Sequence, residues 1–254
     1  MKKIGFIIIA VATLASCSKG IPAINDVEKN NLRGKVKRMV EVINNEKAFP
    51  LHLKDSVIYS FNEKGYLTEV VQHSKIGIEG EGPSYSSITT YYTYNPEGMS
   101  SITYNNNTGD VMEQVTEKYT PEGLVLTKVI NDKDNGRTTT LQHTYNHDKR
   151  EVEAISKTSG IDRTERGVLE YNKQGRIIKG TYYIPPSKEP TVKSNTFYNS
   201  KDYIERREYY YALTENKQVD TYEYKYDSQG SATEIKEYID GVLKSTTKRV
   251  IEYY

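Results

Sequence analysis

From Leu32 to the C-terminus, hydrophobic and polar residues alternate with a period of two. Tyr222, Tyr224 and Tyr226 share one face of such a segment, as do Leu169 and Tyr171. This alternation is typical of β-strands that present one face to each side of a sheet. Turn-forming residues separate the segments, and no convincing helical period occurs. The pattern therefore predicts an all-β domain over residues 32–254.

An aromatic residue followed by a turn of the form Asn-x-x-Gly recurs at intervals of about 26 residues. A repeat of this length indicates a series of similar small units. Asn opens a type I turn and Gly supplies the left-handed residue that closes it. The repeated aromatics are Phe61, Tyr94, Tyr119, Tyr145, Tyr171, Tyr198 and Tyr226. The predicted structural turn glycines are Gly65, Gly98, Gly123, Gly175 and Gly230, whereas Lys149 and Asp202 replace the glycine in the other two units.

Each unit is interpreted as a β-hairpin, so we expect an antiparallel meander of about seven hairpin repeats (~26 residues each). Residues 34–42 resemble a lone second half of a unit, and residues 248–254 a lone first half. We expect the meander to form a rolled or single-layer repeat sheet. The repeated turns lie along one edge, and connections of variable length, including an insertion at 76–83, lie along the other. Variable loops are the usual place for binding residues.

A transmembrane barrel is the alternative for a long meander, and it requires strands with one uninterrupted apolar face. In residues 203–212, Glu205 and Arg207 lie on one face and Arg206 and Glu208 on the other. This segment argues against a bilayer-spanning strand.

The N-terminus has the pattern of a bacterial export signal. Lys2 and Lys3 precede an apolar stretch over residues 4–14, which is shorter than the ~20 residues of a membrane-spanning helix. Cys17 then follows Leu14-Ala15-Ser16, which resembles a lipobox. This resemblance implies cleavage before Cys17 and lipid attachment there. The predicted organisation is a signal peptide at 1–16, a lipidated tether at 17–31 and the repeat domain at 32–254. Residues 18–22 lack acidic residues, which favours a periplasm-facing outer-membrane lipoprotein over a surface-exposed one.

Composition narrows the partner classes. Without Lys2 and Lys3, 33 basic residues (35 − 2) face 34 acidic ones, so the mature chain has no net charge that would favour nucleic acid. The 23 tyrosines argue against disorder despite a mean hydropathy of −0.72. With one cysteine in the chain, no disulfide is expected in the folded part.

The units at 171–177 (Tyr-Asn-Lys-Gln-Gly-Arg-Ile) and 222–230 resemble those of the YD-repeat, or rearrangement-hotspot, family. The resemblance covers residues 32–254, although the units are longer and Asn mostly replaces Asp. It also extends to short YD-repeat lipoproteins of Bacteroidetes. The resemblance implies rolled antiparallel sheets with a structural or carbohydrate-contacting role, and it brings no catalytic residues.

No motif predicts an active site, a cofactor or a metal centre. The segment 131–136 has alternating acids but lacks the further ligands of a calcium loop, and a hairpin turn explains it. His143 and His147 flank the Tyr145 turn, where an acid/base or metal role is conceivable, but four histidines without a cysteine favour a strand-face His and a solvated turn His. Glu79 and Glu81 are two acids in a glycine-rich insertion, where a hydrolase would lack rigid support.

We therefore expect a non-enzymatic, lipid-anchored envelope protein that acts as a binding or scaffold module. The first hypothesis is protein interaction with another envelope protein, and the alternative is binding of a polysaccharide by tyrosine faces. A hydrolase is the remote alternative. The residues expected to bind are Tyr92, Tyr222, Tyr224, Glu79 and Glu81.

Overall fold

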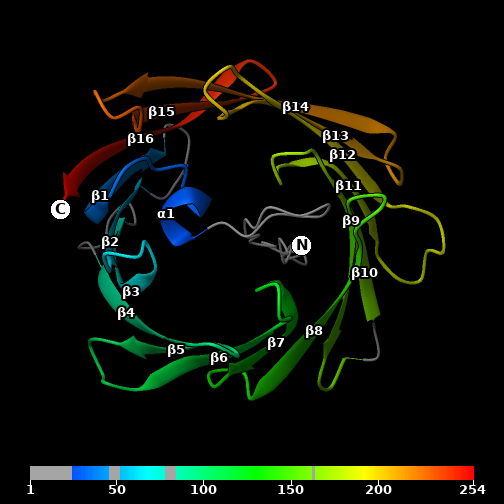
Figure 1. The fold of residues 1–254 in the computed structure, drawn as a ribbon, viewed down its shortest axis with the longest axis horizontal. Coiled ribbons are helices and arrows are strands. Elements are labelled where there is room, and N and C mark those ends of the chain that lie inside the picture. Colours follow the sequence, from blue (N-terminus) through cyan, green and yellow to red (C-terminus); the bar gives the residue numbers. More distant parts are fainter. Residues whose placement is uncertain (1–24, 46–51, 78–83, 162–163) are drawn as a thin grey trace.

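The structure is a closed β-barrel of sixteen antiparallel strands with one short helix inside the ring (Figure 1). It is a computed structural model that describes residues 25–45, 52–77, 84–161 and 164–254, and every structural statement below concerns these residues. Each strand pairs with its neighbours in the sequence, and the first strand pairs with the last. The prediction of about seven hairpin repeats in a rolled or single-layer repeat sheet is wrong, because the meander closes into a barrel of sixteen strands.

The helix α1 spans Asp26–Lys29. The strands in the first half of the barrel are β1 (Val36–Asn45), β2 (His52–Phe61), β3 (Leu67–Gly77), β4 (Ser84–Asn95), β5 (Gly98–Asn105), β6 (Val111–Tyr119), β7 (Val125–Asp132) and β8 (Arg137–Asn146). Those in the second half are β9 (Glu151–Thr158), β10 (Thr164–Tyr171), β11 (Ile177–Tyr183), β12 (Val192–Tyr198), β13 (Ile204–Tyr211), β14 (Asn216–Tyr226), β15 (Ala232–Ile239) and β16 (Val242–Tyr253).

The seam between β1 and β16 explains why the chain has a half-unit at each end. The two strands pair from Val36 opposite Tyr253 to Asn45 opposite Ser245, so the two half-units together form one more hairpin-like pair. An open sheet of this length would leave two strand edges with unpaired backbone N–H and C=O groups. Closure satisfies these groups and removes both edges.

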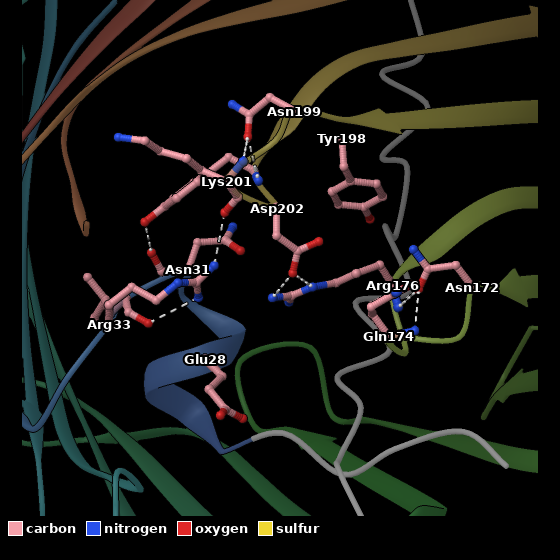
Figure 2. A network of polar contacts seen from close by, with 12 residues as sticks. Glu28, Asn31, Arg33, Asn172, Gln174, Arg176, Tyr198, Asn199, Lys201 and Asp202 are labelled. Carbon is pink, nitrogen blue, oxygen red and sulfur yellow. Dashed lines mark hydrogen bonds and ion pairs between the residues drawn. The ribbon is translucent and has the colours of Figure 1, made fainter. Parts of the chain in front are cut away.

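The repeated turns share one hydrogen-bonding scheme that explains the recurring Asn. The side-chain Oδ1 of Asn172 accepts from the backbone N–H groups of Gln174 (3.0 Å) and Arg176 (2.9 Å), as Figure 2 shows. Asn62, Asn199 and Asp227 accept two backbone N–H groups at the same offsets. An Arg176–Asp202 ion pair of 2.7 Å joins two successive turns. Asp can therefore replace Asn at this position, because either side chain supplies the acceptor oxygen.

Four of the five predicted turn glycines have a left-handed backbone, with φ of +82° at Gly65, +81° at Gly123, +76° at Gly175 and +87° at Gly230. Asp202 adopts φ 67° in the unit that lacks the glycine. In the unit with Lys149, the left-handed residue is the next one, Arg150, at φ 54°. Gly98 differs, since it begins β5 and lies against the backbone of Glu117, where a Cβ would overlap the carbonyl oxygen.

The repeated aromatics connect neighbouring hairpins. Register shifts typical of β-bulges occur at Phe61, Tyr119, Tyr171, Tyr198 and Tyr226, all at the same end of the barrel. The hydroxyl of Tyr145 donates to the carbonyl of Val125 (2.7 Å), and that of Tyr198 donates to Ile177 (2.9 Å). Each bond satisfies a backbone carbonyl in the preceding hairpin, so the tyrosine period has a structural cause.

The segment from Asn25 to Lys35 packs on the inner side of this end. Asn25 caps α1 in a reciprocal capping box with Glu28. Asp26 is buried and accepts hydrogen bonds from the Tyr94 hydroxyl (2.6 Å) and the Leu67 N–H (2.9 Å). The segment is therefore attached to β3 and β4 through one buried carboxylate.

Apolar packing is divided between two clusters on the barrel wall. One comprises Leu124, Val152, Leu169 and Tyr171, with Tyr145, Ile177 and Tyr182 packed against them. The other comprises Val27, Leu32, Val36, Met39 and Phe61, with Tyr59, Leu67, Ile251 and Tyr253 packed against them. The second cluster buries the apolar side of α1, which accounts for its position beside the wall in Figure 1.

Candidate functional site

The position of α1 identifies the face of the sheet that lines the lumen. The helix lies inside the ring (Figure 1) and contacts Met39 and Tyr94. Side chains alternate between the faces of a strand, and directly paired residues share a face. The strand registers then assign the lumen face around the whole barrel, from Tyr59 opposite Met39 to Arg249 opposite Glu41.

The lumen face is rich in tyrosine, with both neutral polar and charged side chains between the rings. Its members on the later strands include Tyr182, Thr196, Arg207, Tyr209, Gln218, Asp220, Tyr222, Tyr224, Glu237 and Ser245. Its members on the earlier strands include Tyr59, Gln72, Thr90, Tyr92, Thr103, Glu113, Glu117, Lys128, Thr139 and His143. This wall is mixed, because apolar side chains such as Met39, Leu141 and Val152 share it with the tyrosine rings and the polar groups.

The outer face of β9–β15 carries ion pairs. Arg166 pairs with Glu153, Lys179 with Glu170 (2.9 Å), Arg206 with Glu208 (3.3 Å) and Lys225 with Glu234 (2.7 Å). Arg166 also lies 4.6 Å from the ring centre of Tyr183, and Arg206 lies 4.3 Å from that of Phe197. These charged groups are partly to largely exposed, so the outer wall of this sector is hydrophilic.

One buried ion pair joins the lumen face across the seam. The Glu41 carboxylate accepts from Arg249 Nε (2.7 Å) and from the Tyr59 hydroxyl (3.0 Å). Both members of the ion pair are about one-tenth exposed. Arg249 also donates to the carbonyl of Asn30 in the segment that follows α1. The pair therefore connects β1, β2, β16 and the N-terminal segment.

A second polar group lies on β13–β16. Glu237 accepts from the hydroxyls of Tyr222 (3.2 Å) and Ser245 (3.1 Å), and Asp220 accepts from Gln218 (2.8 Å). Arg207 lies directly opposite Asp220 in the register. Burial raises the pKa of Asp220 above its ordinary value. The group combines an arginine, two carboxylates and tyrosine rings on one part of the lumen wall.

A third polar group lies on β6–β8. Glu117 pairs with Lys128 (3.1 Å) and accepts from the Tyr119 hydroxyl (3.3 Å). His143 is buried two residues from Leu141, which pairs with Lys128, and its Nδ1 has no hydrogen-bond partner. Burial lowers the pKa of His143, and the nearby Glu117 only partly opposes this shift.

The tyrosines predicted to bind lie on the lumen face, but in different sectors. Tyr222 and Tyr224 are neighbours on β14, and Tyr224 donates to the carbonyl of Ile204 (2.7 Å). Tyr92 lies on β4, and burial raises its pKa to about 12. Cys17, Glu79 and Glu81 lie outside the described residues, so lipid attachment and the role of the two acids stay predictions.

Sequence reasoning missed the group formed by Arg207, Asp220 and Glu237. The signal was present in the alternation, since Arg207 shares its strand face with Tyr209 and Tyr211. In the sequence, Arg207 argues against a lipid-facing strand, but no local pattern shows that its face lines a lumen. Closure of the barrel turns that face toward the lumen.

The surface hollow and the acidic turn at 131–136 were also compared with ligand and metal sites. A hollow of about 350 Å³ lies near the variable-turn end and is lined by Val42, Ser56, His73, Ser74, Lys75, Tyr85, Ser86, Ser87 and Asn107. Within the described ranges, no three His, Cys, Asp or Glu side chains are arranged to hold a metal ion. In the 131–136 turn, the Asp132 carboxylate accepts from the backbone N–H (3.0 Å) and side chain (2.6 Å) of Asn135, which is turn chemistry.

The helical content of the described chain includes no segment with the length and hydropathy to span a membrane. No observation in the described residues tests the prediction that the protein has no cofactor.

Comparison with known proteins supports the barrel fold. A porin-like protein from Bacteroides uniformis matches with a TM-score of 0.60 at 14% identity, over 87% of this chain and 98% of that chain. A porin-like protein from Bacteroides vulgatus matches with a TM-score of 0.48 at 10% identity, over 84% of this chain and 97% of that chain. No family model and no curated protein sequence matches the chain.

These findings correct the functional prediction. The binding or scaffold module, its polysaccharide-binding alternative and the remote hydrolase all depend on accessible tyrosine faces or on loops at the variable edge of the sheet. In the closed barrel the tyrosine face is enclosed, and the similar fold is that of a porin-like protein. The description as a hairpin-repeat binding lipoprotein with YD repeats is therefore not supported.

Proposed function

We propose that the chain is a porin-like aqueous tube at the cell envelope, which takes small polar solutes into its lumen while its outer wall stays in water. One observation carries this proposal. In β9–β15 the two faces differ, with tyrosine rings and polar groups on the lumen face and cross-strand ion pairs on the outer face.

The lumen supports an aqueous interior. Barrels of sixteen strands are wide enough for a water-filled channel, whereas eight strands are just filled by side chains. The two apolar clusters are local to the wall, and polar residues such as Gln72 and Glu113 occupy lumen positions between them. Tyrosine hydroxyls and carboxylates give such a wall hydrogen-bonding partners for water and for small polar solutes.

The outer wall argues against burial in lipid. A bilayer-spanning barrel needs an outward apolar band, and each Arg or Lys at the bilayer midplane costs about 2–4 kcal/mol. Arg166, Lys179, Arg206 and Lys225 all lie on the outer face together with their acidic partners. At the midplane, four such residues would together cost about 8–16 kcal/mol, which is comparable to the whole stability of an ordinary domain, about 5–15 kcal/mol.

The porin-like description of the similar fold supports a passive role without chemistry on the solute. It also favours a place at the outer membrane. Because the outer wall of β9–β15 is hydrophilic, we place the barrel beside this membrane on its periplasmic side, and not within the bilayer.

Cysteine accessibility tests the aqueous lumen with a matched pair of neighbours. Thr247 lies on the lumen face opposite Ile43, and Thr246 lies on the outer face opposite Asn44. In a Cys17→Ser background, Thr247→Cys and Thr246→Cys each provide one thiol. We expect a small charged thiol reagent to label both. A polymer-linked maleimide too wide for the lumen should label Thr246→Cys alone.

Two results would overturn the proposal. A Thr247→Cys thiol that resists the small reagent in the folded protein would show that the lumen is filled. Equal labelling of both variants by the large polymer would show that the face is not enclosed. Circular dichroism of each variant verifies that the barrel is folded before labelling.

A further inference from the structure

The lumen face of the barrel carries more acidic than basic side chains. Among the directly paired residues of the described strands, this face has eight acids and four bases. The outer face has the opposite balance, with eight acids and thirteen bases. The whole chain is nearly balanced, with 35 basic and 34 acidic residues. The barrel therefore separates charge between its two faces.

The sector beside the seam keeps one uncompensated carboxylate. Glu41 is balanced by Arg249, at 2.7 Å. On β2, Asp55 lies between Ile43 and Ser74 in the paired register, so no base is directly opposite it. The Oδ1 atom of Asp55 is buried and has no hydrogen-bond partner.

The sector of β6–β8 has three acids and two bases. Glu117 is paired with Lys128 at 3.1 Å, and Asp132 lies directly opposite Arg137. Glu113 lies opposite Asp132 on the other side and is the acid in excess. Burial raises the pKa of Glu113 above its ordinary value of 4.5.

The later strands carry the remaining lumen charges. On β13–β15, Arg207 is the single base beside two acids, Asp220 and Glu237. Glu165 on β10 is the eighth acid, and it lies opposite Ser156. The acidic excess is thus spread over four sectors of the ring and is not confined to one cluster.

The N-terminal segment inside the ring offsets only part of this excess. Residues 25–35 contain two acids, Asp26 and Glu28, and three bases, Lys29, Arg33 and Lys35. The segment therefore reduces the excess of four negative charges on the lumen face to three.

We propose that the lumen favours small cationic solutes, such as organic amines, over anions of the same size. This inference rests on the aqueous lumen of the proposed function. Low-dielectric walls lined by charge of one sign focus the field in the water between them and raise the local concentration of counter-ions. The bases of the outer face lie toward bulk water, where dissolved ions screen them.

The width of the barrel makes this preference depend on salt. Sixteen strands at about 4.8 Å spacing, tilted by about 40°, place opposite backbones about 30 Å apart. The Debye length is about 30 Å at 0.01 M salt and about 3 Å at 1 M. The field therefore extends across the lumen at low salt and is screened close to the wall at high salt. We expect a preference on the order of tenfold at low salt, the lower end of what focused fields produce.

Two methanethiosulfonate reagents of similar size and opposite charge test this preference. One carries a trimethylammonium group and the other a sulfonate, and both react with Thr247→Cys in a Cys17→Ser background. Each rate is divided by the rate of the same reagent with the same variant unfolded in urea, which removes differences in intrinsic reactivity. A pH of 8 lies far above the ordinary pKa values of the lumen carboxylates, so Glu113 and Asp220 stay ionised although burial raises the pKa of each.

The ratio of the two normalised rates, cation over anion, should be about ten at 0.01 M salt and close to one at 1 M salt. Thr246→Cys is the control, because Thr246 lies on the outer face opposite Lys236. Its ratio should not exceed one.

A matched pair of charge-removing variants locates the source of the field. In the Thr247→Cys protein, Glu237→Gln removes one lumen carboxylate and keeps an acceptor oxygen for Tyr222 and Ser245. It should lower the ratio at least about twofold. Glu234→Gln removes an acid from the outer face of the same strand and should leave the ratio unchanged.

The possible results separate this inference from the proposed function. If both reagents reach Thr247→Cys with a ratio of one or less at low salt, the lumen is aqueous and the cation preference is wrong. Equal effects of Glu237→Gln and Glu234→Gln would also overturn the preference. If neither reagent reacts with the folded variant, the aqueous lumen itself is wrong, and the preference fails with it. Circular dichroism verifies that each variant is folded.

Discussion

At the scale of single residues, several side chains on the lumen wall are explained by backbone geometry or burial and not by ligand chemistry. His143 is 6% exposed and its Nδ1 has no partner. The Gly98 backbone lies so close to Glu117 that no Cβ fits. Both residues belong to the same sector, since Met99 pairs with Glu117 and Glu117 pairs with Lys128. They therefore provide local tests of this part of the barrel.

Stability should fall at acidic pH because of His143. Burial holds its pKa below the ordinary 6.5, so the unfolded chain takes up this proton first as the pH falls. Above pH 6.5 His143 is neutral in both states and does not reduce the free energy of unfolding. As the pH falls from 6.5 toward the folded pKa, protonation of the unfolded chain lowers that free energy. Thermal unfolding of wild type and His143→Gln from pH 8 to pH 5 should diverge below about 6.5. Parallel curves for the two proteins would contradict this.

Gly98→Ala should destabilise the barrel by at least about 1–3 kcal/mol, because the added methyl overlaps a carbonyl oxygen and the strands must separate. Ser100→Ala on the same strand is the control, since Ser100 is exposed on the outer face, and it should change stability little. Urea unfolding midpoints of the two variants measure the difference. Equal midpoints would show that the β5–β6 contact adjusts without cost.

At the scale of elements, the N-terminal segment acts as a brace between distant strands. The Tyr203 hydroxyl donates toward the carbonyls of Asn31 (2.7 Å) and Gly230 (2.8 Å) and accepts from the Ala232 N–H (3.1 Å). Figure 2 shows the neighbouring contacts, where Arg33 reaches the Lys201 carbonyl at 3.2 Å. The same segment is held on the other side of the seam by Asp26.

Tyr203→Phe should therefore cost about 1–3 kcal/mol, because it leaves buried backbone groups without a partner. Tyr224→Phe loses one bond, to the Ile204 carbonyl, and should cost less. Hydrogen exchange gives a more specific result than the midpoint alone. Amides of residues 25–35 should lose protection in Tyr203→Phe and keep it in Tyr224→Phe. Unchanged protection in both variants would contradict the proposal that Tyr203 holds the N-terminal segment against the strands.

The sequence allowed prediction of local elements more fully than of their assembly. The Asn-x-x-Gly units fall at turns because Asn oxygens and left-handed glycines act within a few residues. The pairing of β1 with β16 joins residues more than two hundred positions apart, and no local pattern encodes it. The lumen group around Arg207 was missed for the same reason, since a face is recognised as a lumen only after closure.

At the scale of the whole molecule, the central claim is a sixteen-stranded barrel with a polar lumen and a wall in water. The most direct measurement is reconstitution of the full chain, with Cys17→Ser to remove any lipid attachment, into liposomes for osmotic swelling. The account predicts a dispersed protein in detergent-free buffer and no swelling in small sugars. Stable insertion with swelling that depends on sugar size would contradict it.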